Sequence, residues 1–308
     1  MLREKMNTIS GCITAMITPF NKKLQVDYNG LRELVKFQIG SGISGLAPLG
    51  TTGEAPTIDD EERKGIIETV VDEAEGKVPV IVGTGSNSTE KTVKYTKEAE
   101  RLGAEAALVV TPYYNRPSQE GIYHHFKALS EATRLPIIVY NIPSRTGVNI
   151  ETETMVRIAK LDNVMGVKES SKNMQQMMDV INSMPNGFSV LSGDDNYTLP
   201  LIALGGHGAI SVVSNLLPSR VSEMVRNALS GNMELARKLH YELMPIFKGA
   251  FIEPNPAPIK AAMNIAGMPA GSVRAPLCSM EAKNIERLKS AIGRYSELRS
   301  YKKAPTRQ

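Results

Sequence analysis

The feature that most constrains the fold of this chain is the regular alternation of short apolar runs with longer amphipathic segments. The runs are Gly11–Phe20, Gly45–Gly50, Val78–Gly85, Ala106–Tyr114, Pro136–Pro143, Val164–Ser170, Phe188–Asp195 and Gly208–Asn215. They are rich in consecutive Val, Ile, Leu and Ala, which is typical of parallel strands buried on both faces. Helical periodicity marks the segments between them, at Asp27–Ser41, Asp59–Glu75, Ser88–Leu102, Ser118–Thr133, Glu151–Leu161 and Met174–Met184.

Eight strand–helix units in succession predict a (β/α)8 TIM barrel. An open, doubly wound parallel sheet has the same alternation and remains an alternative. Strand signals end near Ser219, and four helical segments follow, at Val221–Leu229, Met233–Phe247, Ala257–Ala266 and Met280–Leu298. We therefore expect a catalytic barrel over residues 1–230 and a C-terminal helical extension over 231–308, whose tail from Lys302 to Gln308 is frayed.

The composition excludes several classes of protein. Hydrophobic residues make up 42% of the 308 residues and charged residues 22%, which is ordinary for a soluble globular protein. No apolar run approaches the length of a membrane helix, and no signal-peptide pattern is present, so a cytoplasmic protein is expected. The net charge of +4 is mild and dispersed, which argues against nucleic-acid binding. Cys12 and Cys278 lack metal-ligand spacing and read as small buried thiols.

Lys168 is the strongest candidate for chemistry, because it follows the apolar stretch Val164–Val167 within a predicted strand. Lysine is almost never fully buried without a reason. Burial disfavours the charged form of a lysine, and the neutral amine is a nucleophile that forms Schiff bases with carbonyl compounds. The alternative is a lysine at a strand end that extends into solvent.

Further candidates follow other predicted strands, at the end where TIM barrels keep their active sites. In Gly50-Thr-Thr-Gly-Glu54, hydroxyls and backbone N–H groups are suited to hold a carboxylate or relay a proton, although an ordinary turn would look the same. Tyr113 and Tyr114 follow the fourth strand. Since successive strand residues point to opposite sides, at most one of them is expected at the barrel mouth of its own chain, and both could be packing aromatics.

The fifth predicted strand ends in Tyr140-Asn-Ile-Pro-Ser-Arg-Thr146. A tyrosine beside a lysine can act as an acid or base, and the planar fork of Arg145 suits a carboxylate. After the seventh strand, Gly193 permits close approach of the backbone, while Asp194 and Asp195 read as a helix cap slightly better than as metal ligands. No set of Asp, Glu and His residues has the spacing of metal ligands, and the adjacent His124 and His125 face two directions on a helix.

Four motifs in combination, Gly50-Thr-Thr-Gly-Glu54, Tyr140-Asn-Ile-Pro-Ser-Arg-Thr146, Val167-Lys-Glu169 and Leu191-Ser-Gly-Asp-Asp195, resemble those of the pyruvate-dependent class I aldolases of the dihydrodipicolinate synthase and N-acetylneuraminate lyase family. The resemblance runs from about Gly11 to Glu253-Pro-Asn-Pro-Ala-Pro-Ile-Lys260. It implies a homotetramer that condenses pyruvate with L-aspartate 4-semialdehyde, on the route to diaminopimelate and lysine, without a metal or organic cofactor.

The resemblance also implies roles for individual residues. Lys168 would form the imine with pyruvate, and Tyr140, Thr51 and Tyr114 would relay protons, with Tyr114 reaching into the neighbouring subunit. The expected substrate-binding residues are Thr52, Gly193, the backbone at Ile210, and Arg145 for the carboxylate of the semialdehyde.

Arg145 distinguishes between relatives, because the sialic acid lyases and sugar-acid aldolases usually replace it. A Schiff-base aldolase or dehydratase acting on a 2-oxo sugar acid, and a barrel that binds without catalysis, remain alternatives. Lysine-inhibited relatives tend to carry histidines at the positions of Asp60 and Arg63 and a glutamate at that of Lys91, whereas Asn87 and Tyr113 match. Two cations would repel a lysine effector, so we expect weak or absent feedback inhibition.

Overall fold

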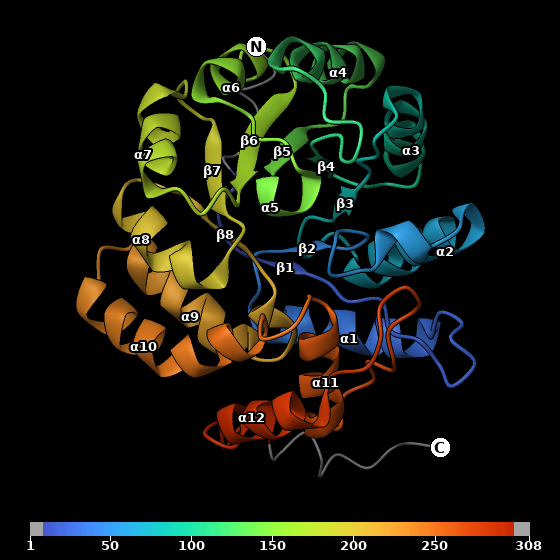
Figure 1. The fold of residues 1–308 in the computed structure, drawn as a ribbon, viewed down its shortest axis with the longest axis vertical. Helices are drawn as coiled ribbons and strands as arrows, with labels where there is room; N and C mark the ends of the chain where they lie inside the picture. Colours follow the sequence, from blue (N-terminus) through green and yellow to red (C-terminus); the bar gives the residue numbers. More distant parts are fainter. Residues whose placement is uncertain (1–8, 299–308) are drawn as a thin grey trace.

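The computed structural model describes residues 9–298, and its strands form one parallel sheet in the order β2-β1-β8-β7-β6-β5-β4-β3 (Figure 1). A parallel bridge between Leu46 and Val80 joins the two ends of this order, so the sheet closes into a barrel. The strands are β1 Gly11–Ala15, β2 Gly45–Ala47, β3 Ile81–Gly83, β4 Ala106–Val110, β5 Ile137–Asn141, β6 Val164–Glu169, β7 Ser189–Ser192 and β8 Gly208–Ser211. The predicted (β/α)8 barrel is confirmed, and the open sheet is wrong.

Helices follow the strands in turn and surround the barrel (Figure 1). The α-helices of the described residues 9–298 are α1 Tyr28–Gly40, α2 Asp60–Ala74, α3 Thr89–Arg101, α4 Gln119–Ala132, α5 Pro143–Thr146, α6 Thr152–Ile158, α7 Met174–Ser183, α8 Thr198–Ala203, α9 Pro218–Leu229, α10 Met233–Gly249, α11 Ala257–Ala266 and α12 Ala282–Ile292. The 3₁₀ helices are η2 Ala55–Thr57, η3 Asp195–Tyr197 and η4 Val213–Asn215. Side-chain caps fix several starts: Asp59 forms a capping box with Glu62, and Ser88 and Ser118 each accept a backbone N–H three residues on.

The strands are shorter than the apolar runs that predict them, and the difference lies mainly at their carboxyl ends. The first run extends to Phe20 whereas β1 ends at Ala15. The residues beyond the strand remain buried, as Met16 and Ile17 show. Apolar content reports burial rather than strand geometry, so it does not mark the point at which a strand becomes a buried loop.

Alternate strand residues serve two different apolar layers. In β5, Ile138 and Tyr140 belong to the core inside the barrel, while Ile137 and Val139 pack against the surrounding helices. Both faces of each strand are therefore covered, which explains the continuous apolar runs. Tyr140 pairs in register with Lys168 of β6, and this register places both residues on the inner side of the barrel wall.

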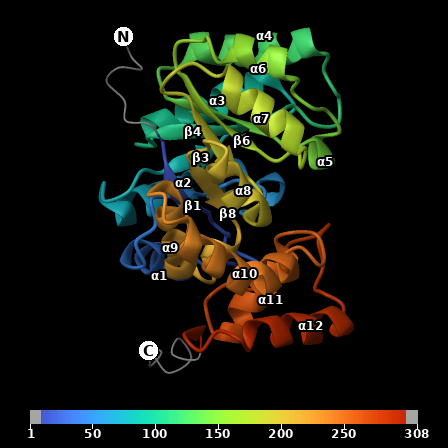
Figure 2. The same ribbon diagram turned by 90° about the vertical axis from the view of Figure 1, so that its left-hand side faces the viewer.

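Helices α10, α11 and α12 lie outside the ring, with α11 and α12 beyond α10 at one side of the barrel (Figure 2). The expected boundary between a barrel over 1–230 and an extension over 231–308 falls in the turn between α9 and α10, and this division stays a prediction. The expected frayed tail, Lys302–Gln308, lies outside the described residues. Within residues 9–298, none of the helices has the length and apolar character needed to cross a membrane. Cys12 is buried as expected, but Cys278 is exposed, so that part of the expectation is wrong.

Candidate functional site

Lys168 and Tyr140 lie side by side at the carboxyl ends of β6 and β5. Lys168 is only 4% exposed, and its Nζ lies 4.2 Å from the centroid of the Tyr140 ring. The alternative of a lysine extending into solvent is therefore wrong. An amine beside the ring of a phenol, inside a barrel wall and near its mouth, is a suitable arrangement for imine chemistry with proton transfer.

Gly193 provides the space that the lysine side chain occupies. A Cβ atom at this position would lie 2.9 Å from Lys168 Cε and would also collide with the Ser170 hydroxyl. Any larger residue at position 193 must therefore displace the lysine. The side chains of Lys168 and Ser170 thus approach Gly193 closely, while its expected contact with a substrate stays a prediction.

Thr51 and Thr52 belong to a tight turn after β2, in which the N–H of Gly53 donates to the carbonyl of Gly50 at 3.1 Å. Thr51 lines the cavity described below. Thr52 is buried, and its Oγ1 accepts a hydrogen bond of 2.9 Å from Nδ2 of Asn255. The two hydroxyls thus have different surroundings, although they are neighbours in the sequence.

A buried ion pair anchors the end of this turn. Glu54 Oε1 lies 2.8 Å from Lys260 Nζ in α11, and the side chains are 0% and 1% exposed. Lys260 also donates to the carbonyls of Thr18 and Ser272, at 2.9 and 2.6 Å. Burial lowers the pKa of Lys260 to about 8, and the Glu54 carboxylate opposes that shift. Sequence reasoning assigned no role to this pair, because its members are 206 positions apart and nothing in either motif indicates the contact.

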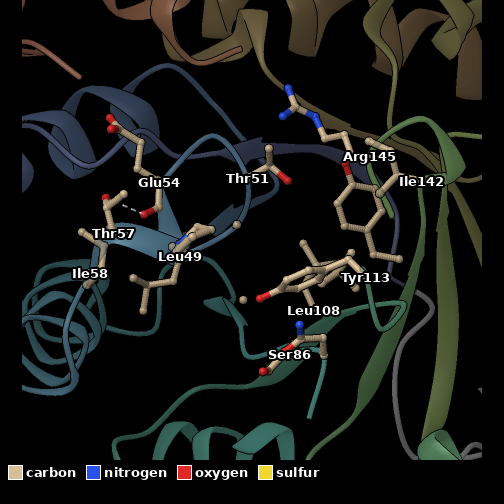
Figure 3. A pocket seen from close by; sticks show the side chains of 18 of the residues that line it. Leu49, Thr51, Glu54, Thr57, Ile58, Ser86, Leu108, Tyr113, Ile142 and Arg145 are labelled. Carbon is tan, nitrogen blue, oxygen red and sulfur yellow. Dashed lines mark hydrogen bonds between the residues drawn. The ribbon is translucent and has the colours of Figure 1, made fainter. Parts of the chain in front are cut away.

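A cavity of about 490 Å³ opens at the carboxyl ends of the strands (Figure 3). Thr51, Tyr113, Tyr140 and Arg145 are among its lining residues. Figure 3 shows Thr51 and Arg145 on one side of this space, with Tyr113 and Ser86 across from Thr51. The cavity is large enough for a small substrate, and its polar groups converge from β2, β4 and β5.

Arg145 stands at the entrance, in the short helix α5 that Pro143 begins. Its side chain is exposed, and its Nη2 donates to the main-chain carbonyl of Asn255 at 3.0 Å. The remaining guanidinium donors are available for a carboxylate. The predicted position of this arginine beside the site is thus present in the structure.

The two adjacent tyrosines have different positions. Tyr113 lines the cavity, whereas Tyr114 is 88% exposed with a φ of +73° and lies outside it. This agrees with the expectation that at most one of the pair faces the barrel mouth of its own chain. Tyr114 does not join Thr51 and Tyr140 within a single chain.

The cavity continues from Tyr113 toward a second group of polar residues, which includes Arg63, Asn87, Lys91 and Tyr95. Arg63 is buried; its Nη1 donates to the carbonyl of Gly83 at 2.8 Å, and its guanidinium lies 4.2 Å from the Tyr95 ring centroid. Asp60 is not part of this lining. Its carboxylate pairs with Lys94 at 2.6 Å on the surface.

The structure also shows the surroundings of three other residues that the sequence singles out, Ile210, Asp194 and Asp195. Ile210 lies in β8 beside Ile13, with its side chain in the inner core, and it is not among the residues that line the cavity, so the expected contact of its backbone with a ligand stays a prediction. The Asp194 side chain makes no hydrogen bond that caps η3. The Asp195 carboxylate accepts hydrogen bonds from the Ser211 hydroxyl and from the backbone N–H groups of the two residues after Ser211. The expected cap of their own helix, η3, is therefore not formed: the Asp195 carboxylate instead binds the N–H groups at the start of η4, in the turn after β8. Burial raises the pKa of Asp195 to about 6, against these hydrogen bonds.

Among residues 9–298, no group of three or more His, Cys, Asp or Glu side chains is placed to hold a metal ion. His124 is exposed beside Glu120, while His125 is buried, its Nδ1 3.0 Å from the Thr89 hydroxyl. The two histidines face two directions, as their adjacent positions on α4 predict.

Comparison with known proteins agrees with this geometry. Residues 8–294 match the model of the dihydrodipicolinate synthetase family. The chain belongs to this family. The 4-hydroxy-tetrahydrodipicolinate synthase of Protochlamydia amoebophila is 50% identical over 91% of this chain and 94% of its own length.

Solved structures of family members have the same fold. Dihydrodipicolinate synthase from Thermotoga maritima superposes with a TM-score of 0.91 at 43% identity, covering 94% of this chain and 100% of that one. The enzyme from Acinetobacter baumannii, solved in complex with pyruvate, has a TM-score of 0.92 at 38% identity, with 93% and 99% covered. The family match extends beyond Lys260 into α12, so the C-terminal helices belong to the shared fold and not only to this chain.

Proposed function

We propose that this protein is a 4-hydroxy-tetrahydrodipicolinate synthase that condenses pyruvate with L-aspartate 4-semialdehyde. The observation that carries the proposal is the buried Lys168 against the Tyr140 ring, at the carboxyl end of a barrel of this family. The name of the Protochlamydia relative and the pyruvate bound in the Acinetobacter enzyme support the same reaction. The product enters diaminopimelate and lysine biosynthesis.

In the proposed mechanism the neutral amine of Lys168 attacks the keto carbon of pyruvate, and water leaves to give a protonated imine. The imine withdraws electrons from the methyl carbon, which loses a proton to form the enamine. The enamine carbon attacks the aldehyde carbon of the semialdehyde. The amino group of that substrate then attacks the imine carbon, and ring closure releases Lys168. The imine is itself the electron sink, and the residues proposed here supply the proton transfers.

Tyr140 is the proposed acid and base for these proton transfers, because its ring lies against the lysine amine. Thr51 lines the same cavity and would pass protons between Tyr140 and the mouth. Thr52 and the backbone at Gly193 and Ile210 would hold pyruvate. Arg145, at the entrance, would attract the carboxylate of the semialdehyde. This arginine favours a short, charged aldehyde over the polyhydroxylated aldehyde of a sugar-acid aldolase.

We also propose a cytoplasmic homotetramer in which Tyr114 completes the proton relay of a neighbouring subunit. The support is that this large aromatic side chain is exposed in its own chain and held by a left-handed backbone conformation outside its own cavity. Sedimentation measures the assembly directly. A monomer that is fully active would contradict the role of Tyr114.

The test of the function is mass spectrometry of the intact protein after incubation with pyruvate and borohydride, beside the variant Lys168→Ala. We expect one reduced pyruvate on the wild-type protein and none on the variant. Lys172→Ala is a matched control, because this lysine lies just beyond β6 and pairs loosely with Asp194 at 4.0 Å. An unmodified wild-type protein would favour a non-catalytic barrel, and preference for a sugar-acid aldehyde would favour the related aldolases.

A further inference from the structure

Asn255 reaches the candidate site from outside the barrel. It lies in the segment between α10 and α11, yet it lines the cavity and is only 4% exposed. Sequence reasoning gave this residue no role. Two residues with a proposed function, Thr52 and Arg145, form hydrogen bonds with it.

Two separate groups of Asn255 contact two different substrate-binding residues. The side-chain Nδ2 donates to Thr52 Oγ1 at 2.9 Å, and the main-chain carbonyl accepts from Arg145 Nη2 at 3.0 Å. A threonine hydroxyl that accepts one hydrogen bond still has its own proton to donate. Asn255 therefore leaves the Thr52 proton free for a carboxylate and limits the positions that the Arg145 fork can take.

Packing does not explain an amide at this position. The Asn255 Oδ1 atom is buried without a hydrogen-bond partner among the described residues. A buried polar atom without a hydrogen-bond partner destabilises the folded state, and an apolar side chain of similar size would avoid that cost. The position thus carries a stability cost that a residue with a purely structural role would not need.

We propose that Asn255 is a positioning residue that sets the two carboxylate-binding groups of the site independently of each other. Its side chain acts through Thr52 on pyruvate, and its main chain acts through Arg145 on the semialdehyde. This inference rests on the proposed function. It predicts that side-chain substitutions at 255 weaken pyruvate binding and leave aldehyde binding unchanged, because the carbonyl remains in every variant.

The test is a comparison of Asn255→Ala, Thr52→Val and the double variant. For each, we would measure the pyruvate concentration that gives half-maximal borohydride trapping, which needs no aldehyde, and the KM of the semialdehyde. Loss of one hydrogen bond corresponds to an increase of up to about tenfold. We expect such an increase for pyruvate in Asn255→Ala, a semialdehyde KM within about twofold of wild type, and no further increase when Asn255→Ala is added to Thr52→Val.

Two further variants complete the design. Asn255→Asp keeps the side-chain shape but removes the donor, so it must weaken pyruvate binding too, even if the alanine variant does not fold. Asn264→Ala removes an amide in α11 that bonds to Gly271, and it should leave pyruvate trapping unchanged. An unchanged pyruvate dependence in Asn255→Ala and Asn255→Asp, or effects that add fully to those of Thr52→Val, would overturn the inference. A wild-type protein that traps no pyruvate would instead refute the proposed function itself.

Discussion

The substitution Lys260→Met tests how strongly the C-terminal helices hold the turn that carries Thr51 and Thr52. It removes the ammonium group 2.8 Å from Glu54 Oε1, where both side chains are buried. Glu54 Oε2 would keep its hydrogen bond from the N–H of Arg274, at 2.8 Å, but Oε1 would lose its ion-pair partner. Breaking a buried ion pair from one side costs about 3–5 kcal/mol, because the remaining charge is left buried without compensation. We therefore expect Lys260→Met to lower the free energy of unfolding by about 3–5 kcal/mol.

The assay is urea unfolding followed by circular dichroism, with three variants. Lys289→Met is the matched control, since it removes an ion pair of 2.7 Å to Glu286 whose partners are exposed, and we expect a change below about 1 kcal/mol. The double variant Glu54→Gln, Lys260→Met should regain part of the lost stability because no buried charge remains. If Lys260→Met were as stable as the control, or less stable in combination with Glu54→Gln, our account of this pair would be refuted.

Two other predictions concern pH and regulation. Burial lowers the pKa of His125 to about 4, so the unfolded chain binds a proton that the folded chain refuses as the pH falls from about 6.5 toward 4. The contribution of His125 to the free energy of unfolding should therefore be complete above pH 6.5 and decline by about 3 kcal/mol across this window, at about 1.4 kcal/mol per pKa unit. The difference in stability between wild type and His125→Gln should change with pH by about this amount, whereas the difference between wild type and the exposed His124→Gln should not; the same pH dependence in both variants would count against this assignment. L-lysine should inhibit weakly or not at all, since Arg63 and Lys91 line the cavity that continues from Tyr113, and an inhibition constant in the submillimolar range would contradict this expectation.

Much of the fold could be predicted because the signals that determine it are local. Helix starts at Asp60, Thr89 and Gln119 follow side-chain caps that can be read directly from the sequence. Apolar runs locate the strands, but they do not mark the residues at which the strands end. There the chain turns into buried loops whose composition resembles that of the strand. The errors thus fall where the loops form the site.

The site residues on strand ends were predictable for a related reason. Parallel strands bring their carboxyl ends to one edge, so Thr51, Tyr140 and Lys168 converge although they are far apart in the sequence. Contacts that depend on tertiary packing could not be read in this way. Asp195 looked like a cap for its own helix, and only the structure shows it bonded to the turn after β8.

Asn255 and Lys260 show why the C-terminal segment belongs to the functional unit. Both lie after residue 230, outside the eight strand–helix units, and both contact the turn that follows β2. Asn255 bonds Thr52 within that turn, and Lys260 neutralises Glu54 at its end. A barrel without these residues would leave the Glu54 carboxylate buried without its cation and the Thr52 hydroxyl without its donor. The strands therefore place the reactive groups. The segment after residue 230 fixes the orientation of the turn after β2, which is proposed to bind substrate beside those groups.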